Sequence, residues 1–415
     1  MTVVISNYSA QCGITFSHFT IVFSVFSLAM TTMADRTDLD QVLHDGSKQF
    51  TAKIFYEVAK ANKEKSIVLS AYSLMPPLAQ LALASVGESH DEILNAIGMP
   101  NDDISKAAFS SITSKLRSVK GVTLQTANKI YIGKDLELNK KFAAAARESF
   151  DSETENIDFL QREEAAKKVN AWVEDHTNHR IKDLVDPKQL TADTRALLVN
   201  AIYFKGTWKK AFDENETTPK EFHLSKEEAV YVPTMHSKGQ YKYTDNQELK
   251  AQILEISYEG DESSFVIVLP HEIDGINDLE EKLRDPSALD KAMNHLKETE
   301  VEVYLPKFKI ETTTDLKKIL EKIHLEKMFT PRLAKLEKLI DNRGDLYIDS
   351  AIQKAFIEIN EEGAEAAAAN AFHVFEITSV NRYKEMTPQF VADRPFYFAV
   401  KTNSLTLFNG VLRNF

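Results

Sequence analysis

The chain has 415 residues, of which 43% are hydrophobic and 27% are charged. This composition is typical of a soluble globular protein and argues against a disordered chain, a collagen or a repeat array. The net charge of −12 argues against nucleic acid as a partner, because phosphate binding needs a basic surface. Such a charge is typical of a soluble monomer, which we therefore expect.

The N-terminal 34 residues contain no Asp, Glu, Lys or Arg, and residues 19–30 form an apolar run. This run is short for a membrane span but suits the core of a signal peptide. We therefore expect residues 1–34 to be a leader and the mature protein to be secreted, extracellular and free of membrane. The alternative is translation from Met33, which gives a cytoplasmic protein. The single cysteine, Cys12, allows no disulfide framework and no cysteine metal site.

Beyond the leader, apolar residues at helical spacing predict a helix over 47–61, where Phe50, Ile54, Phe55 and Val58 share one face. Residues 104–119 and 161–178 show the same spacing. The second half is richer in strands: 265–269 is a continuous apolar run, and residues 301–305 and 396–400 alternate. A further helix follows Thr314, capped by that residue or by Asp315. Helices first and strands later predict an α+β fold.

No residue pattern supports catalysis. Ser89, His90 and Asp91 are consecutive in the chain, so they cannot form the nucleophile, base and orienting group of a triad. There is no G-x-S-x-G elbow, no glycine-rich phosphate loop and no cluster of histidines at metal-ligand spacing. We therefore expect neither an enzyme, nor a metal site, nor a cofactor. The acidic pairs Glu280-Glu281 and Glu361-Glu362 are typical of solvated surfaces.

The unusual segment is the alanine-rich stretch from Glu361 to Phe372. Local propensity favours a helix, since alanine is the best helix former. Its context differs, because Ala355–Ile359 reads as a strand before it and another strand begins at Phe396. A strand, a hinge of small residues, a long loop and a second strand therefore predict an exposed loop over about 361–391.

This segment resembles the reactive-loop hinge of inhibitory serpins, the serine protease inhibitors. Further motifs in the family's order extend the resemblance over residues 45–415: Ser70-Ala-Tyr-Ser73, Gly87-Glu-Ser-His-Asp-Glu-Ile-Leu94, Asn170-Ala-Trp-Val173, Arg180-Ile-Lys182, Leu198-Val-Asn-Ala-Ile-Tyr-Phe-Lys-Gly-Thr-Trp208, Leu305-Pro-Lys-Phe308, Asp393-Arg-Pro-Phe-Tyr-Phe398 and Leu407-Phe-Asn-Gly-Val411. The body is most similar to insect haemolymph serpins, in which one body is joined to different reactive loops. The resemblance implies a single serpin domain over 35–415, with three β-sheets, about nine helices and the loop at one pole.

It also implies a mechanism, in which a target serine protease cuts the loop and is trapped as a covalent acyl-enzyme while the hinge inserts as a strand. The implied hinge residues are Glu361, Glu362, Gly363, Ala364, Glu365, Ala366, Ala367, Ala368 and Ala369. The implied residues of the sheet-opening region are Ser70, Ser73, Asn200, Trp208 and Gln353. Gln353 replaces a histidine that many serpins carry, and Ala71 replaces a common proline. The alternative is a non-inhibitory serpin that acts as a carrier, storage protein or folding helper.

Two counts along the loop disagree about the scissile bond. The family places the bond about 14 residues after the hinge glycine, which gives Ile377 and Thr378. A count back from Pro395 gives Lys384 instead, so the loop is longer than usual. We favour Ile377–Thr378, because trapping depends on the length that inserts. The rivals are cuts after Arg382, Tyr383 or Lys384, or after Phe375.

Asn215-Glu-Thr217 is a glycosylation sequon in a polar stretch. A glycan on Asn215 would agree with secretion. We therefore predict glycosylation at this residue.

Overall fold

Two hydrogen-bonded β-sheets and nine α-helices make up the described part of the computed structural model, which covers residues 16–191, 193–341, 345–363, 387–402 and 404–415. Of residues 16–37 only the backbone is described. The helices are α1 (Phe16–Ala61), α2 (Met75–Ala84), α3 (Glu88–Ala96), α4 (Asp102–Ser118), α5 (Lys140–Phe150), α6 (Arg162–His176), α7 (Ile276–Lys282), α8 (Ala288–Met293) and α9 (Leu316–Lys322). The strands are β1 (Ile67–Leu69), β2 (Val122–Gly133), β3 (Glu153–Ile157), β4 (Ala196–Gly206), β5 (Thr218–His223), β6 (Ala229–Asn246), β7 (Ala251–Ser257), β8 (Ser263–Pro270), β9 (Lys297–Pro306), β10 (Phe308–Asp315), β11 (Ser350–Ile359), β12 (Gln389–Val391), β13 (Phe396–Thr402) and β14 (Thr406–Leu412).

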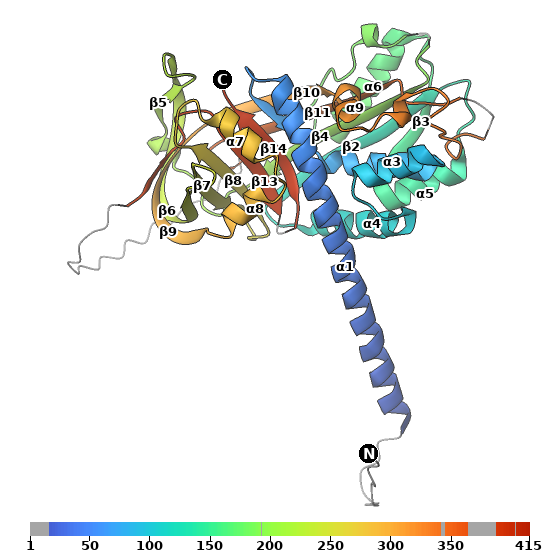
Figure 1. The fold of residues 1–415 in the computed structure, drawn as a ribbon, viewed down its shortest axis with the longest axis horizontal. Coiled ribbons are helices and arrows are strands. Elements are labelled where there is room, and N and C mark those ends of the chain that lie inside the picture. Colours follow the sequence, from blue (N-terminus) through green and yellow to red (C-terminus); the bar gives the residue numbers. More distant parts are fainter. Residues whose placement is uncertain (1–15, 192, 342–344, 364–386, 403) are drawn as a thin grey trace, which may run out of the picture.

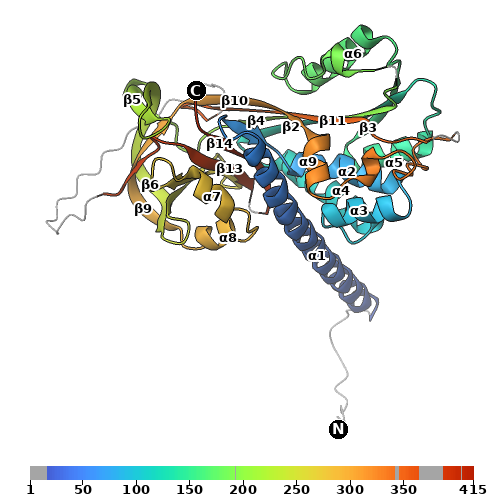
Figure 2. The same ribbon diagram turned by 45° about the horizontal axis from the view of Figure 1, so that its top comes forward.

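The five-stranded sheet has the order β10-β11-β4-β2-β3, with β4 at its centre. Strand β4 pairs antiparallel with β2 and parallel with β11. Helix α6 covers one face of this sheet, and α2 to α5 lie on the other side (Figure 2). Because both faces are covered, β4 is buried at every position but one, as expected of a central strand.

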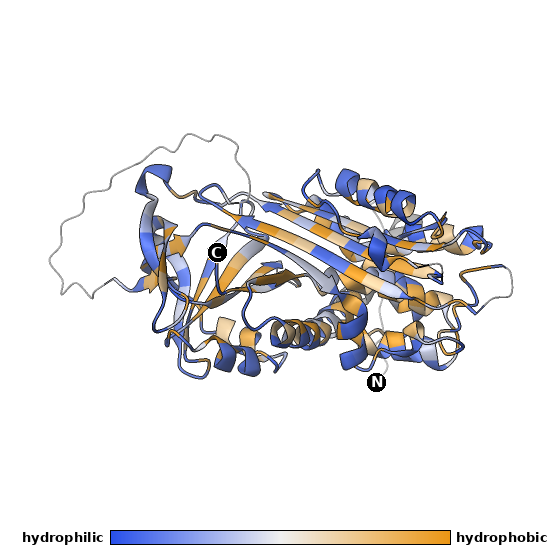
Figure 3. Ribbon diagram, turned by 90° about the horizontal axis from the view of Figure 1, so that it is seen from above, coloured by the Kyte–Doolittle hydropathy of each residue, from blue (hydrophilic) through white to orange (hydrophobic). Residues whose placement is uncertain are grey.

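The second sheet has nine strands, in the order β1-β14-β13-β8-β7-β6-β9-β12 with β5 also paired to β6. Strand β6 is 18 residues long and joins two parts of this sheet, since it pairs with β7 near its end and with β5 and β9 before that. The expected three sheets are thus joined into two hydrogen-bonded networks. The hydropathy colouring in Figure 3 shows apolar residues concentrated along the strands and hydrophilic residues along the outer faces of the helices.

The α+β fold predicted from the sequence is confirmed. The helical spacing at 104–119 corresponds to α4, which Asn101 caps by accepting a hydrogen bond from the Ile104 amide. The helix expected after Thr314 is α9, and Asp315 is its cap. The sequence did not reveal β2 and β4, which lie in the half that we expected to be mostly helical. All but one residue of β4 and the last seven residues of β2 are buried, and burial on both faces removes the alternation that identifies a strand.

Helix α1 extends over 46 residues, and its N-terminal part points away from the body (Figure 1). The predicted apolar face is confirmed, because Phe50, Ile54, Phe55 and Val58 are all buried. Residues 1–15 of the expected leader lie outside the described residues, and 16–34 belong to α1, so cleavage of a leader stays a prediction. Among the described residues, no helix has the length and apolar character needed to span a bilayer.

Candidate functional site

The seam between β4 and β11 is the feature around which the candidate site is built. The two strands run parallel in register from Ser350 opposite Leu197 to Phe356 opposite Tyr203. Beyond this point they separate, so the last residues of β4 have no partner on the β11 side in the described ladder. The space at this end of the seam is taken by a turn at the end of β11.

This turn, residues 360–363, begins the predicted hinge. Gly363 forms antiparallel bridges with both Asn360 and Thr207, so it already lies between the ends of β11 and β4. The backbone amide of Trp208 donates to the Glu362 carbonyl at 2.9 Å, and the Trp208 indole Nε1 donates to the Asn360 carbonyl at 2.9 Å. The turn is therefore held on β4 by its backbone.

Gly363 is required at this position for two separate reasons. Its φ of 120° lies in a region that residues with a side chain rarely adopt. A Cβ atom there would lie 2.1 Å from the Gly206 carbonyl oxygen, which belongs to the backbone and cannot swing away. The resemblance placed Gly363 in the hinge but did not reveal its close approach to β4.

Glu361 is buried, with an exposed fraction of 4%, so the expectation of a solvated Glu361-Glu362 pair was wrong for this residue. Its carboxylate accepts a hydrogen bond from the Thr217 hydroxyl at 2.7 Å and pairs with the Lys307 ammonium at 2.7 Å. Burial acts to raise the pKa of Glu361, but the hydrogen bonds from Lys307 and Thr217 outweigh it and hold the pKa below its ordinary value. The carboxylate is therefore charged at neutral pH and fixes the start of the hinge.

The other acidic pair also departs from expectation, because Glu280 is buried and pairs with Arg413. Two opposite charges that are buried together compensate each other's loss of hydration, whereas burial of either charge alone would destabilise the fold. Sequence patterns of adjacent acidic residues do not reveal such partners, since they lie far away along the chain.

Four of the predicted sheet-opening residues, Ser70, Ser73, Asn200 and Gln353, form one buried polar cluster in the middle of the seam. The Ser73 hydroxyl donates to Asn200 Oδ1 at 2.9 Å, and the Gln353 Nε2 donates to the same oxygen at 2.6 Å. Gln353 also donates to the Ser70 carbonyl at 2.8 Å. The amide thus bridges β11, β4 and the chain segment that ends in the short helix at Tyr72–Leu74.

The fifth predicted residue, Trp208, lies outside this cluster, at the hinge end of the seam. Its ring stacks on Tyr258 with a centroid distance of 4.6 Å, while its indole nitrogen binds the hinge turn. It is therefore both a core aromatic residue and a hinge contact, the two roles that the sequence left open.

Three contact residues were missed from the sequence. Asn128 on β2 accepts a hydrogen bond from Asn200 and extends the polar cluster, and Lys307 and Thr217 hold Glu361. Lys307 lies in a motif that we recognised, but its role becomes visible only when β9 and the hinge come together. Asn128 gave no signal, because a single polar residue carries no spacing, and Thr217 was noted only as part of the glycosylation sequon, which does not indicate its contact with Glu361.

The predicted hinge residues Ala364, Glu365, Ala366, Ala367, Ala368 and Ala369 lie outside the described residues. The same holds for the candidate cleavage residues Phe375, Ile377, Thr378, Arg382, Tyr383 and Lys384. On the far side of this segment the chain re-enters the second sheet earlier than expected, because Gln389–Val391 form β12, which pairs parallel with β9. Gln389 donates to Glu302 at 3.0 Å, which adds a side-chain contact to this short strand.

Among the described residues there is no group of three or more His, Cys, Asp or Glu side chains that could hold a metal ion. Asn215 is exposed, and its neighbour Thr217 contacts Glu361. The sequon therefore lies beside the hinge, and its glycosylation stays a prediction.

Comparison with known proteins agrees with this geometry. Alaserpin from Manduca sexta is 53% identical over 94% of this chain and 98% of its own length. Antitrypsin from Bombyx mori is 48% identical over 95% of this chain and 99% of its own. The crystal structure of a highly specific serpin from the insect Tenebrio molitor superposes with a TM-score of 0.83 at 34% identity, covering 91% of this chain and 99% of that one. The family Serpin (serine protease inhibitor) matches residues 45–415, and the chain belongs to it.

Proposed function

We propose that this serpin inhibits a serine protease by trapping it as a covalent acyl-enzyme, with the cut loop inserted as a strand between β4 and β11. The observation that carries the proposal is the position of Gly363, which is bridged to Thr207 and Asn360, the residues that directly follow β4 and β11. A strand that continued from Gly363 would run antiparallel to both neighbours. It would therefore pair on both sides without any reversal of β4 or β11.

The two bridges give the same register for such a strand. Seven residues beyond Gly363, Asn370 would lie opposite Asn200 on β4 and Gln353 on β11, which already face each other. Asn370 would thus enter the polar cluster and supply an amide where hydrogen bonds are needed. Asn370→Leu should lower the melting temperature of the cleaved form more than that of the intact form.

The same register explains why the hinge needs small residues. Ala366 and Ala368 would lie level with Phe204 and Ile202, which belong to the main apolar core. Glu365 would point to the opposite face, on the side of α6. Insertion of about 14 residues at about 1 kcal/mol net for each hydrogen bond would release on the order of 10 kcal/mol.

The length of the seam supports a cut after Ile377. In this register Val374 would lie opposite Ala196, the first residue of β4. Ile377 would then lie just past the far end of the sheet, so the attached protease would be pulled against the body. A cut after Arg382, Tyr383 or Lys384 would leave additional residues between the inserted strand and the attached protease. Insertion would then not pull the protease against the body.

Hinge substitutions test insertion. Ala364→Arg places a charge on the core-facing side, where burial without a partner costs several kcal/mol. It should convert the inhibitor into a substrate, visible as loss of the SDS-stable complex and appearance of cleaved protein. Glu365→Arg is the matched control, because the same side chain lies on the opposite face and should leave trapping intact. Equal trapping by both variants would contradict the proposed register.

The mass of the C-terminal peptide released from the trapped complex locates the bond. We expect a peptide that begins at Thr378. A peptide beginning at Tyr383, Lys384 or Glu385 would show that one of the rival residues is used. If every protease that cuts the loop turns over without a stable complex, the non-inhibitory alternative of a carrier, storage protein or folding helper holds instead.

Secretion and glycosylation belong to the same proposal, and their support is the apolar leader and the exposed sequon at Asn215. We expect protein recovered from the medium of producing cells to begin near Asp35 and to lose mass on treatment with a glycosidase. An unglycosylated cytosolic product that begins at Met33 or Ala34 would contradict both.

A further inference from the structure

The predicted loop leaves and re-enters the described structure at two roots. The first root is the turn at 360–363, which Glu361 anchors through Thr217 and Lys307. The second root is β12, where the chain returns to the nine-stranded sheet and pairs with β9. How firmly these two roots are held decides how the segment between them is presented to a protease.

The second root depends strongly on one residue of β9. Strand β12 has only three residues and lies at the edge of its sheet, in parallel pairing with a single neighbour. Parallel pairing is slightly less stable per residue than antiparallel pairing. The backbone amide of Glu302 donates to the Pro388 carbonyl at 3.0 Å, and the Glu302 carboxylate accepts from the Gln389 amide at 3.0 Å. Glu302 therefore holds this root with both its backbone and its side chain.

His236 on β6 lies between Glu302 and a carboxylate next to the first root. Its Nδ1 atom is 2.8 Å from Glu216 Oε2, and its Nε2 atom is 3.3 Å from Glu302 Oε1. Glu216 directly precedes Thr217, whose hydroxyl donates to Glu361. The contacts therefore form a continuous line from the first root to the second, with the imidazole ring in the middle.

The chemistry of the two carboxylates makes this line depend on protonation. Carboxylate oxygens only accept hydrogen bonds, and both ring nitrogens of His236 face one. A neutral imidazole has a single N–H group, so it can donate to Glu216 or to Glu302 but not to both. The doubly protonated ring donates to both and pairs its positive charge with them. The bridge is therefore complete only when the ring is charged, and one link is lost as the pH rises through the range in which a histidine ordinarily titrates.

The partners of the ring keep their charges over this range. The hydrogen bonds from Gln389 and Tyr304 hold the pKa of Glu302 below its ordinary value, so its carboxylate is charged at pH 6 as well as at pH 8. Tyr304 on β9 also stacks on the His236 ring with a centroid distance of 4.7 Å.

Two lysines also lie near the ring. The Lys220 ammonium of β5 is 4.6 Å from the centroid of the Tyr304 ring, and Lys238 on β6 pairs with Glu300 at 3.7 Å. Because lysines ordinarily keep their charge up to about pH 10, the group that changes near neutral pH in this set is the histidine.

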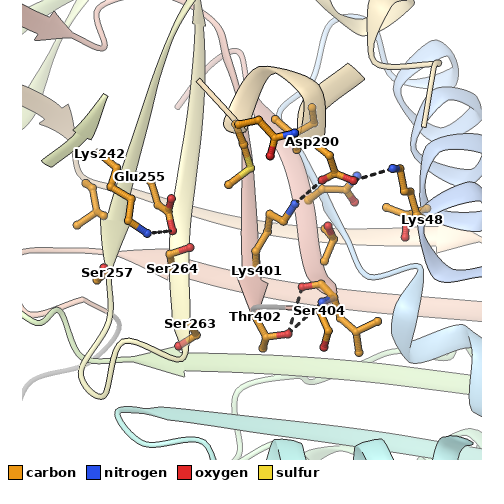
Figure 4. Close-up of a pocket in the computed structure, with 18 of the residues that line it drawn as sticks. Lys48, Lys242, Glu255, Ser257, Ser263, Ser264, Asp290, Lys401, Thr402 and Ser404 are labelled. Atoms are coloured by element: carbon orange, nitrogen blue, oxygen red, sulfur yellow. Dashed lines mark hydrogen bonds and ion pairs between the residues drawn. The ribbon is translucent and has the colours of Figure 1, made fainter. Parts of the chain in front are cut away.

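A second group of three charges shows why the histidine matters. Asp290 pairs with Lys48 at 2.8 Å and with Lys401 at 2.9 Å, on the wall of the pocket shown in Figure 4. Aspartate and lysine both ordinarily carry their charges throughout the neutral range, so that group is the same at pH 6 and at pH 8. The bridge at His236 has one cation between two anions, and this cation is the member that titrates.

We propose that His236 is a positioning residue that joins the two roots of the loop and tightens the second root when its ring is doubly protonated. The two roots are then fixed relative to each other, so a protease meets the segment between them in a narrower range of positions. The bridge itself does not depend on trapping, whereas its effect on trapping rests on the proposed function.

Amide hydrogen exchange of the intact full chain, followed by mass spectrometry, tests the bridge without a protease. His236→Gln keeps a polar side chain that is neutral at every pH. At pH 6 it should speed exchange of the β12 amides by about twofold to fivefold, as expected from loss of a partly exposed ion pair. At pH 8, above the ordinary range of a histidine, it should match the parent. An equal increase at both pH values, or none at either, would overturn the proposal.

The matched control is His90→Gln. His90 also lies between two carboxylates, with Nδ1 3.0 Å from Asp91 and Nε2 3.0 Å from Asp102, but on α3, at the other end of the molecule from β6 and β9 (Figure 1). This variant should leave exchange of the β12 amides unchanged at both pH values. If it changes them as much as His236→Gln does, the effect is not local to the bridge and the proposal fails.

The parent alone provides a test that needs no folded variant. Once corrected for the chemical exchange rate, protection of the β12 amides should fall by about twofold to fivefold from pH 6 to pH 8. Protection of β10, an edge strand of the other sheet, should stay constant. Constant protection of β12 would contradict the proposal.

Transmission between the roots is tested by loosening one and observing the other. Gln389→Ala removes a contact of β12 with Glu302 and should speed exchange of the amides of residues 213–218 at pH 6. The same substitution in the His236→Gln variant should leave those amides unchanged. If Gln389→Ala has no effect on residues 213–218 in the parent, the two roots are independent and His236 does not join them.

The effect on trapping is measured with pancreatic elastase, whose pocket accepts small aliphatic side chains. The rate constant for complex formation should be about twofold to fivefold lower for His236→Gln than for the parent at pH 6 and equal at pH 8. The ratio of trapped to cleaved protein should not change, because insertion follows the cut. If elastase is not trapped at all, the proposed function is in doubt while the exchange data still decide the bridge. Equal rate constants at pH 6 would show that the bridge does not position the loop.

Discussion

The two sides of β4 are paired with their neighbours in different ways. On one side, β2 pairs antiparallel along all of β4, from Val122 opposite Gly206 to Ile132 opposite Ala196. On the other side, β11 pairs parallel, and its ladder with β4 ends at Phe356 opposite Tyr203. Parallel pairing is slightly weaker per residue than antiparallel pairing.

The difference matters for strand insertion. A strand placed between the parallel pair is antiparallel to both neighbours, whereas one placed between β2 and β4 would be parallel to one of them. The hinge turn occupies the open end of the β11 side, and Gln353 joins the polar cluster to β4 further along the same side. The proposed insertion would therefore use the β11 flank of β4.

The largest effect is expected from Gly363→Ala at the open end of that flank. The new Cβ would clash with the Gly206 carbonyl and hold a side chain at a φ of 120°, so the turn must leave β4. We expect a loss of about 2–4 kcal/mol in the free energy of unfolding and a larger fraction of cleaved, untrapped protein. Urea unfolding and gel analysis measure both.

Gly87→Ala is the matched control for this substitution. Gly87 also has a positive φ, of 63°, but a Cβ there would meet nothing within 4 Å. Only the backbone preference is lost, which costs about 1–3 kcal/mol because the ψ of Gly87 is −141°, and trapping should not change. Equal effects of the two substitutions on trapping would show that contact with β4 is unimportant.

A second comparison uses one glutamine from each flank. Gln353 on the β11 side donates to Asn200 and Ser70, while Gln125 on β2 has a side-chain oxygen without a partner among the described residues. Gln353→Ala should cost about 2–4 kcal/mol, because it leaves buried partners unsatisfied. Gln125→Ala should cost less than about 1 kcal/mol. If thermal unfolding shows similar losses of stability for the two variants, the expected difference between the β11 and β2 sides of β4 is contradicted.

The sequence predicted the family and the fold class, because motifs such as Leu198–Trp208 are local features, while the hinge inferred from the alanine run stays a prediction. It did not predict that Glu361 is buried, since its partners Lys307 and Thr217 lie far away in the chain. It also did not predict the contact of Gly363 with Gly206. These contacts exist only when β4, β9 and the end of β11 meet.

The electrostatic anchor of the hinge predicts a pH dependence. Because the folded-state pKa of Glu361 lies below its ordinary value, the stabilisation is present above the unfolded-state pKa of about 4.3 and is lost as the pH falls through the folded-state value. Lys307→Met should therefore cost about 1 kcal/mol at pH 7, a modest figure because Lys307 is partly exposed.

The difference between Lys307→Met and the parent should shrink as the pH falls through the lowered folded-state pKa of Glu361, because the carboxyl group is then protonated in both. Unfolding by urea at several pH values measures it. Lys226→Met removes an exposed pair with Asp274 and should show little change at any pH. A loss of stability in Lys307→Met that is independent of pH would indicate that packing of the lysine chain, and not its charge, holds the hinge.

The smallest effect is expected on the β2 flank, from Tyr131→Phe. Tyr131 is buried opposite Leu197, and its hydroxyl has no hydrogen-bond partner among the described residues. Removing an unpaired buried hydroxyl relieves its desolvation, while the Lys129 ammonium, 5.2 Å from the ring centroid, can still lie over a phenyl ring. We expect the free energy of unfolding to stay the same or to rise by up to about 1 kcal/mol. Trapping of protease should be unaffected, because the β2 ladder remains closed during insertion between β4 and β11. A change in the ratio of trapped to cleaved protein would show that this flank also moves.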